Sequence, residues 1–274
     1  MKQAETVDAE EDAQHGEADG YSLPEQLSYR EQRLATIQAA RQRLEERARQ
    51  RAEQEQQRRD EEALEREAQG EKPKMYRKQP DAVPKPKEQE NFTDPDSRIM
   101  RDGATKGFIQ AYNAQVAVDA DHQIIVATDL DNQASDQGHF VPVLEQVKEN
   151  TGGYPNQALA DAGYKSEATF EALAEHSTDV YIACGRETYD PRIPCPEGPV
   201  PEEATFTQRM ERKLLTNEGR SIYKKRKHIV EPVFGWVKNV LGFRQTSLRG
   251  QENVRGEWFL VCSALNLRRM AAKA

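Results

Sequence analysis

Apolar positions are sparse in the first third of the chain and regularly spaced in the rest. Between Ser28 and Gly70 about forty residues are rich in Glu, Gln, Arg and Ala, with few larger aliphatic side chains. Ser28 to Glu31 matches a capping box, and Gly70 followed by Pro73 is a stop signal, so we expect one helix of about 60 Å across 28–70. Because its apolar seam is sparse, we favour a solvated arm or weak helical hairpin over a stable dimerising coiled coil.

The segments on either side of this helix lack its periodicity. Residues 1–27 are acidic and have no signal-peptide core, which indicates a disordered tail. Residues 71–90 are rich in Lys and Pro, which indicates an extended linker. The compact region is therefore expected to begin near Asn91 and to extend over 91–274.

The compact region combines strand and helix patterns. Ala114, Val116 and Val118 alternate with polar residues, and a turn at 119–122 leads to a second strand at 124–130, which predicts an antiparallel hairpin. A helix, a strand, a helix, a strand and two helices should follow. Their anchors are Phe140 to Val147 ended by Gly152 and Gly153, Ala158 to Asp161, a helix opened by Ser166, Val180 to Ala183, a Pro-rich loop at 191–201, and helices around Glu231 and Trp258. This order is typical of an α/β sandwich.

Charge is unevenly distributed along the chain. The formal net charge of -8 alone argues against a nucleic-acid partner, but from Gly219 to the end there are 12 Lys and Arg against 3 Asp and Glu. This segment favours a local polyanion-binding face. The three cysteines have neither zinc-site nor disulfide spacing, and no apolar run could span a bilayer. We therefore expect a soluble, cytoplasmic protein with no membrane partner.

One acidic residue, Glu231, interrupts the basic helix. At about 100° per residue, Glu231 shares a face with lysines, and apolar residues share another. The first face holds Lys224, Lys227, Gly235 and Lys238, and the second, core-forming face holds Val230, Phe234, Val237 and Leu241. A carboxylate among phosphate-binding cations repels DNA unless a divalent cation lies between them, as in metal-dependent phosphoryl transfer. The alternative is a solvated helix with a few ion pairs.

Asp161 ends a short apolar strand and precedes Gly163. A carboxylate at the C-terminal end of a strand projects into the crevice where open α/β folds bind ligands. Asp shortly before Gly also suits an ordinary turn, so Asp161 alone decides nothing. Together with Glu231 on a later helix it would suit a Mg²⁺ site, and we expect the two carboxylates to approach each other at the edge of a sheet crevice.

Several motifs occur in the order found in one known family. They are Ala160 to Ser166, Ile229 to Lys238, Asn91 to Arg98, Tyr112 to Gln115, and Leu248 to Trp258. These motifs resemble bacterial insertion-sequence transposases of the DDE class, and the resemblance covers Asn91 to the C-terminus. The charged helix resembles an insertion found in one subgroup. The resemblance implies a ribonuclease H-like mixed sheet with flanking helices, and DNA strand cleavage and transfer with Mg²⁺ or Mn²⁺.

The resemblance assigns Asp161 and Glu231 as the second and third acids, both catalytic and metal-binding. Lys238 matches a basic position of the family, whereas Tyr223 and Lys227 are offset from the family's Tyr and basic residue. We expect salt-sensitive binding of transposon ends and target DNA by a set of basic side chains. These are Lys224, Lys225, Arg226, Lys227, Lys238 and Arg244.

The first acid is where the chain departs from the family, in which it ends the first sheet strand ahead of the helical insertion. The only Asp-Gly pairs begin at Asp19 and Asp102, and neither pair is expected to follow a strand. Asp119, Asp129 and Asp131 have the character of turn or surface residues. We therefore expect the first strand and its Asp to lie upstream of Met1, which leaves an incomplete sheet and a chain inactive alone.

Two other classes of function stay open. One is a non-catalytic DNA-binding or regulatory remnant that forms a homo-oligomer or joins a full-length transposase subunit, and the other is a helical interaction protein. Among single residues, His139 and His228 are expected to be polar surface residues and Trp258 to be core. Trp236 could stack on a flipped base or be partly buried. Asn132 and Gln133 could position DNA or cap the following helix.

Overall fold

The computed structural model describes residues 25–103, 105–174, 176–185 and 192–272. The chain divides into two compact units, residues 1–92 and 93–274, which are described separately. Most of the acidic tail expected at 1–27 lies outside the described residues. In the described part of the chain, no helix is both long and apolar enough to cross a membrane.

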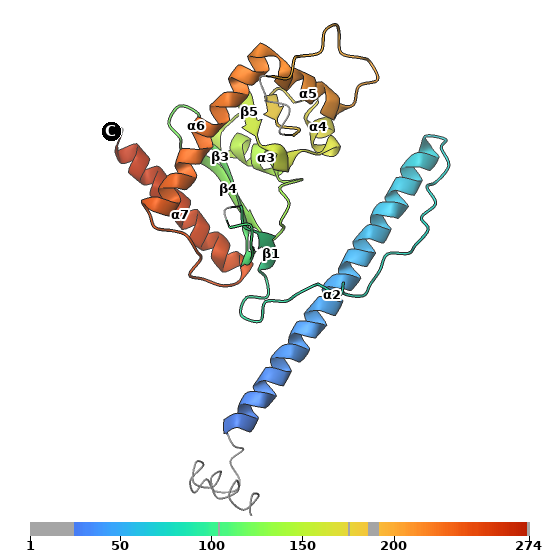
Figure 1. Ribbon diagram of the computed structural model, residues 1–274, viewed down its shortest axis with the longest axis vertical. Helices are drawn as coiled ribbons and strands as arrows, with labels where there is room; N and C mark the ends of the chain where they lie inside the picture. Colours follow the sequence, from blue (N-terminus) through green and yellow to red (C-terminus); the bar gives the residue numbers. More distant parts are fainter. Residues whose placement is uncertain (1–24, 104, 175, 186–191, 273–274) are drawn as a thin grey trace, which may run out of the picture. The chain divides into compact units, whose positions relative to one another are not determined.

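Unit 1 is built on one long helix, α2 (Glu25–Ala68), shown in Figure 1. The helix is already formed at Glu25, so Ser28 lies inside it and does not cap it, contrary to the sequence prediction. The stop signal was correct, because the helix ends two residues before Gly70, which has a φ of 76°. Only small residues are buried on it: Ala40 is 3% exposed and Ala48 is fully buried.

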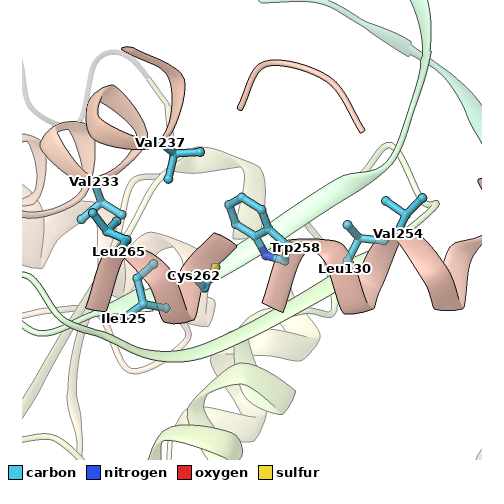
Figure 2. Packing of buried hydrophobic residues seen from close by; sticks show 8 residues of the cluster. All are labelled: Ile125, Leu130, Val233, Val237, Val254, Trp258, Cys262 and Leu265. Atoms are coloured by element: carbon cyan, nitrogen blue, oxygen red, sulfur yellow. The ribbon is translucent and has the colours of Figure 1, made fainter. Parts of the chain in front are cut away.

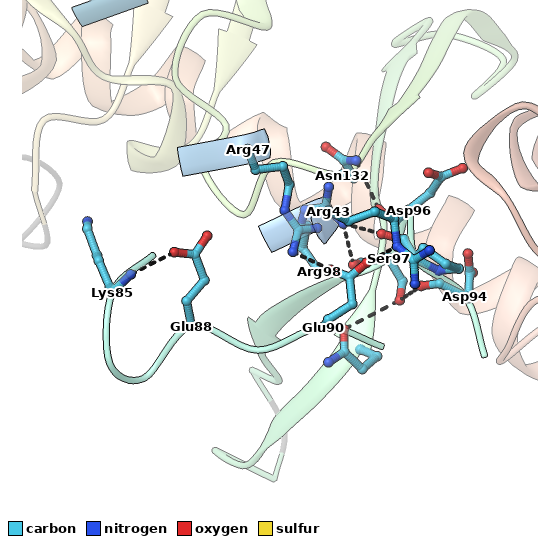
Figure 3. Close-up of polar contacts among 12 residues, drawn as sticks. Arg43, Arg47, Lys85, Glu88, Glu90, Asp94, Asp96, Ser97, Arg98 and Asn132 are labelled. Carbon is cyan, nitrogen blue, oxygen red and sulfur yellow. Dashed lines mark hydrogen bonds and ion pairs between the residues drawn. The ribbon is translucent and has the colours of Figure 1, made fainter. Parts of the chain in front are cut away.

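The segment expected as a linker, 71–90, is extended but lies back along α2 (Figure 1). At its near end, Arg59 donates to the Lys78 carbonyl at 2.8 Å, and its guanidinium stacks 4.1 Å from the ring of Tyr76. Farther along, Glu90 accepts from Arg43 at 2.7 Å and also pairs with Arg47 (Figure 3). The Glu90 side chain is only 2% exposed. The sequence could not predict this packing, because these ion pairs join residues more than forty positions apart.

Unit 2 begins with a hairpin that the sequence analysis missed, β1 (Arg98–Arg101) and β2 (Phe108–Ala111). Asp102 therefore does follow a strand, which corrects the sequence prediction for the pair Asp102-Gly103. Its carboxylate belongs to the turn, where it accepts from the backbone N–H of Thr105 at 2.9 Å and from the Thr105 hydroxyl. Phe108 is 76% exposed, so no core pattern marked this hairpin.

The predicted central hairpin is confirmed as β3 (Asn113–Val118) and β4 (Ile125–Asp131). One face of β3, with Ala114, Val116 and Val118, packs into the core formed with the C-terminal helices. The other face carries Asn113 and Gln115. Helix α3 (Phe140–Thr151) follows, also packs on the hairpin, and ends as predicted at Gly152, whose φ is 82°.

The second half of the sheet region consists of β5 (Gln157–Ala160) and β6 (Asp179–Ile182), paired in parallel. Between them lie the short 3₁₀ turn η1 (Ala162–Tyr164) and helix α4 (Glu167–Leu173). Ser166 caps α4 as predicted, by accepting from the Thr169 N–H at 3.0 Å. Among the described residues the strands form three two-stranded sheets, so β3–β4 and β5–β6 are not joined.

Three helices, not the expected two, complete the chain: α5 (Phe206–Leu215), α6 (Asn217–Asn239) and α7 (Gln251–Ala271). Figure 2 shows the core between α6, α7 and the β3–β4 hairpin. Trp258 lies there as predicted, 4% exposed, and donates through Nε1 to the Thr128 hydroxyl at 2.7 Å. A separate core joins α3, α4, β5 and β6.

The motif at 91–98 anchors the N-terminus of α7. Asp94 is buried and accepts from the Gly250 N–H at 3.1 Å and from the Tyr112 hydroxyl at 2.9 Å. Burial and this hydrogen bond raise the pKa of Tyr112. Asp96 accepts from the Gln251 N–H at 3.0 Å. Both carboxylates therefore occupy the positive end of the α7 dipole, which stabilises the helix.

Candidate functional site

Asp161 lies where the sequence predicted, directly after β5. It caps η1, and its Oδ1 accepts from the Gly163 N–H at 3.0 Å. Its Oδ2 lies 4.0 Å from the Arg226 guanidinium of α6, and half of its side chain is exposed. The carboxylate is thus held at the strand end by a turn and by a cation from α6.

Helix α6 begins at a tight junction with α5. Thr216 caps it by accepting from the Gly219 N–H at 2.9 Å. Gly219 is buried, and a Cβ at this position would overlap the Lys213 carbonyl oxygen. Only glycine fits this close approach of the two helices.

Pro232 lies inside α6, directly after Glu231. Proline has no N–H, so the carbonyl of His228 four residues earlier loses its helical partner. The side chain of Gln123, from the β3–β4 turn, donates to that carbonyl at 2.8 Å. The hairpin therefore replaces the missing hydrogen bond and fixes the helix next to Glu231.

The two acids meet α6 on different faces. Arg226, which holds Asp161, is partly buried on the packed side, whereas Glu231 is exposed with Lys224, Lys227 and Lys238. Glu231 lies five residues beyond Arg226, or about 7.5 Å along the helix axis. Lys225 is also exposed, but at about 100° per residue it projects away from the Glu231 face. Arg244 is exposed after the helix and donates to Asn239.

Sequence reasoning missed one carboxylate beside Asp161, that of Asp136, in the loop before α3. Its Oδ1 accepts from the amides of Asn113 at 2.7 Å and Gln115 at 2.9 Å. A Cβ built on Gly163 would overlap Asp136 Oδ2 and lie 3.1 Å from Asp161 Oδ1, so both carboxylates flank Gly163. In the sequence, Asp136 resembles any turn Asp before a helix, and only its position opposite the polar face of β3 distinguishes it.

Tyr164 completes this polar cluster. Its hydroxyl donates to Gln115 Oε1, and Gln115 is only 2% exposed. Burial, together with Asp136 and Asp161, raises the pKa of Tyr164, so the phenol keeps its proton and remains a donor. The cluster of Asn113, Gln115, Asp136 and Tyr164 therefore links the edge of β3 to the turn after β5.

The other acids named from the sequence have local partners. Asp119 accepts from the His122 N–H at 2.7 Å in the hairpin turn, as expected of a turn residue. Asp129 lies 3.4 Å from Arg255, and Asp131 lies 3.4 Å from His139.

Two further expectations concern the region around α3 and α6. Asn132 does not cap α3, which begins at Phe140; its amide donates instead to the Asp96 carbonyl at 2.9 Å (Figure 3). Trp236 is 37% exposed, and the Arg268 guanidinium lies 5.1 Å from its ring.

The carboxylate oxygens of Asp161 and Glu231 are the ligand type that Mg²⁺ and Mn²⁺ prefer. Their number does not fit a complete metal centre. In the described part of the chain no group of three or more His, Cys, Asp or Glu side chains is arranged to hold a metal ion. The cation beside Asp161 is Arg226.

A comparison with protein families finds one that accounts for most of the chain. A family model described as Transposase DDE domain matches residues 79–267. The match begins within the segment that lies along α2 and includes β1 to β6 and almost all of α7. No curated protein and no solved structure matches the chain.

Proposed function

Because this chain belongs to the Transposase DDE domain family, we propose that it is the C-terminal part of the catalytic region of a DNA transposase and lacks the first acid of the active site. The observation that carries the proposal is the position of Asp161, which ends β5 and is held by the same helix that carries Glu231. Asp161 and Glu231 are then the second and third acids, and Arg226 positions Asp161.

Strand pairing supports the view that the sheet is incomplete. Within the described residues, β3 pairs only with β4, and β5 pairs only with β6. A ribonuclease H-like mixed sheet would be obtained if one further strand lay between β3 and β5. At present the amides of Asn113 and Gln115 project from β3 and are occupied by Asp136. A polar side-chain cluster therefore links elements that backbone hydrogen bonds would otherwise join.

The missing strand would also supply the missing acid. A divalent cation, Mg²⁺ or Mn²⁺, would stabilise the charge that develops on phosphate during strand cleavage and transfer. Asp161 and Glu231 would contribute oxygen ligands, and a third carboxylate at the end of the added strand would complete the donor set. Without it we expect no Mg²⁺-dependent cleavage by this chain.

The basic residues of α6 are proposed to bind the DNA backbone. Lys224, Lys227 and Lys238 are exposed on the face of Glu231, where they can neutralise phosphates on either side of it. Lys225 and Arg244 are exposed at other angles and would extend the contact, while Arg226 serves Asp161. The DNA partners would be transposon ends and target DNA, which places the protein at the nucleoid.

Binding to DNA duplexes at several salt concentrations tests this interface. The triple change Lys224→Ala, Lys227→Ala and Lys238→Ala should lower the affinity and reduce the slope of log affinity against log salt by about 0.9 for each phosphate that the variant no longer neutralises. A matched control removes three exposed lysines of unit 1, Lys72, Lys85 and Lys87. If both triple variants bind equally well, the α6 lysines are only a solvated face.

A second function is favoured by the metal-site geometry. Since the described residues contain no complete set of ligands, the chain could act as a DNA-binding or regulatory remnant that occupies transposon ends without cutting them. This alternative predicts the same DNA binding and salt slope. It differs in predicting no strand cleavage even when an upstream strand with its Asp is supplied.

A further inference from the structure

Helix α7 has two faces of opposite character within unit 2. One face, with Val254, Trp258, Cys262 and Leu265, is buried against the β3–β4 hairpin and α6 (Figure 2). The other is exposed and entirely uncharged. It consists of Gly256, Phe259, Leu260, Ser263, Ala264, Leu267, Met270 and Ala271, and we call it the outer face of α7.

The apolar side chains of the outer face are large and strongly exposed. Leu260 is 70% exposed, Leu267 67%, Met270 60% and Phe259 39%. Together they leave on the order of 400 Å² of apolar surface along about 22 Å of helix, comparable with the largest patches on monomers, which are often functional. A solvated helix face in a chain with 31% charged residues would be expected to carry charge.

We propose that the outer face of α7 binds the same face of a second copy of this chain, with the two helices antiparallel. An uncharged face is self-complementary, because bringing two copies together creates no like-charge repulsion. Leu260, Ala264, Leu267 and Ala271 alternate large and small side chains at spacings of four and three residues. Each leucine of one copy can therefore pack against an alanine of the other, as in close-packed helix pairs.

The charges at the ends of α7 favour the antiparallel arrangement. Glu252 lies in the first turn and has an 83% exposed side chain, whereas Arg268 and Arg269 lie in the last turn. Antiparallel packing places Glu252 of one copy near the basic end of the other and also opposes the two helix dipoles. With its polar rim, such a two-fold contact would bury about 1,000 Å² in total, which is near the lower limit for a specific interface.

The mass of the purified chain in solution tests this proposal and does not depend on DNA or metal. Size-exclusion chromatography with light scattering should give twice the 31.2 kDa of one chain, and Leu267→Glu should give the monomer with unchanged far-UV circular dichroism. The matched control is Leu64→Glu on α2, since Leu64 is 66% exposed, and it should leave the dimer intact. A monomeric wild-type chain at about 100 µM, or a dimer that survives Leu267→Glu, would overturn the proposal.

Single cysteines at the two ends of the outer face test the orientation. A Cβ on Gly256 meets nothing within 4 Å, so Gly256→Cys is tolerated without rearrangement. Under mild oxidation, an equimolar mixture of Gly256→Cys and Ala271→Cys chains should form interchain disulfides between unlike copies, and neither variant alone should do so. Cross-links between like copies of each variant would instead show a parallel pair and contradict the antiparallel arrangement.

Discussion

The contact between Asp136 and Gly163 can be tested by substituting alanine at Gly163. The added Cβ would overlap Asp136 Oδ2, and the carboxylate must rotate away. Rotation breaks the hydrogen bonds from Asn113 and Gln115, each worth about 1.5–3 kcal/mol to a buried charged acceptor and less here, where the loop is partly exposed. Replacing glycine by alanine also stabilises by about 0.4–1 kcal/mol through the unfolded chain. We expect a net loss of about 1–3 kcal/mol.

A double-mutant cycle identifies the cause of this loss. In an Asp136→Ala background the obstruction is absent, so Gly163→Ala should be neutral or slightly stabilising. Urea unfolding of the four variants should therefore give a coupling free energy of about 2 kcal/mol between the two positions. Equal costs of Gly163→Ala in both backgrounds, within about 0.5 kcal/mol, would show that Asp136 does not contact the turn that carries Asp161.

Three further predictions concern stability. Glu257 accepts the N–H groups of Ser247 and Leu248; although burial opposes it, these bonds lower the pKa of Glu257. Its stabilisation is thus complete above the unfolded pKa of about 4.3 and lost as pH falls through the folded value, so Glu257→Gln should destabilise at pH 7 but little at pH 3. In urea unfolding, Trp258→Phe should cost about 1–2 kcal/mol and Trp258→Ala about 3–5. Limited proteolysis should cut 71–90 faster in Glu90→Ala, but not in Glu53→Ala, since Glu90 binds two arginines and Glu53 is exposed.

Local signals in the sequence were sufficient for several elements of unit 2. Gly152 ended α3 because a left-handed residue is needed there, and Ser166 opened α4 because its hydroxyl accepts a free N–H of the first turn. The alternation of Ala114, Val116 and Val118 gave the buried face of β3. In each case the determining interaction lies within a few residues of the position or follows from strand periodicity.

Elements fixed by distant contacts could not be predicted in the same way. Helix α5 was missed because only Leu214 is buried on it, which leaves little apolar periodicity. The strands β1 and β2 expose most of their large side chains. Asp136 reaches the site through Asn113 and Gln115, more than twenty residues away in sequence. The Asp94 and Asp96 carboxylates, part of a recognised motif, bond with backbone groups about 155 residues later.

The central claim is that Asp161 and Glu231 belong to one active site that an added strand completes. The most direct measurement is Mg²⁺- or Mn²⁺-dependent nicking of supercoiled plasmid by this chain joined to the polypeptide encoded directly upstream of it. We expect the extended chain to nick DNA and the chain of residues 1–274 not to. Asp161→Asn and Glu231→Gln should each abolish nicking while DNA affinity is retained. Nicking that persists in either variant of the extended chain, or robust nicking by residues 1–274 alone, would contradict the account.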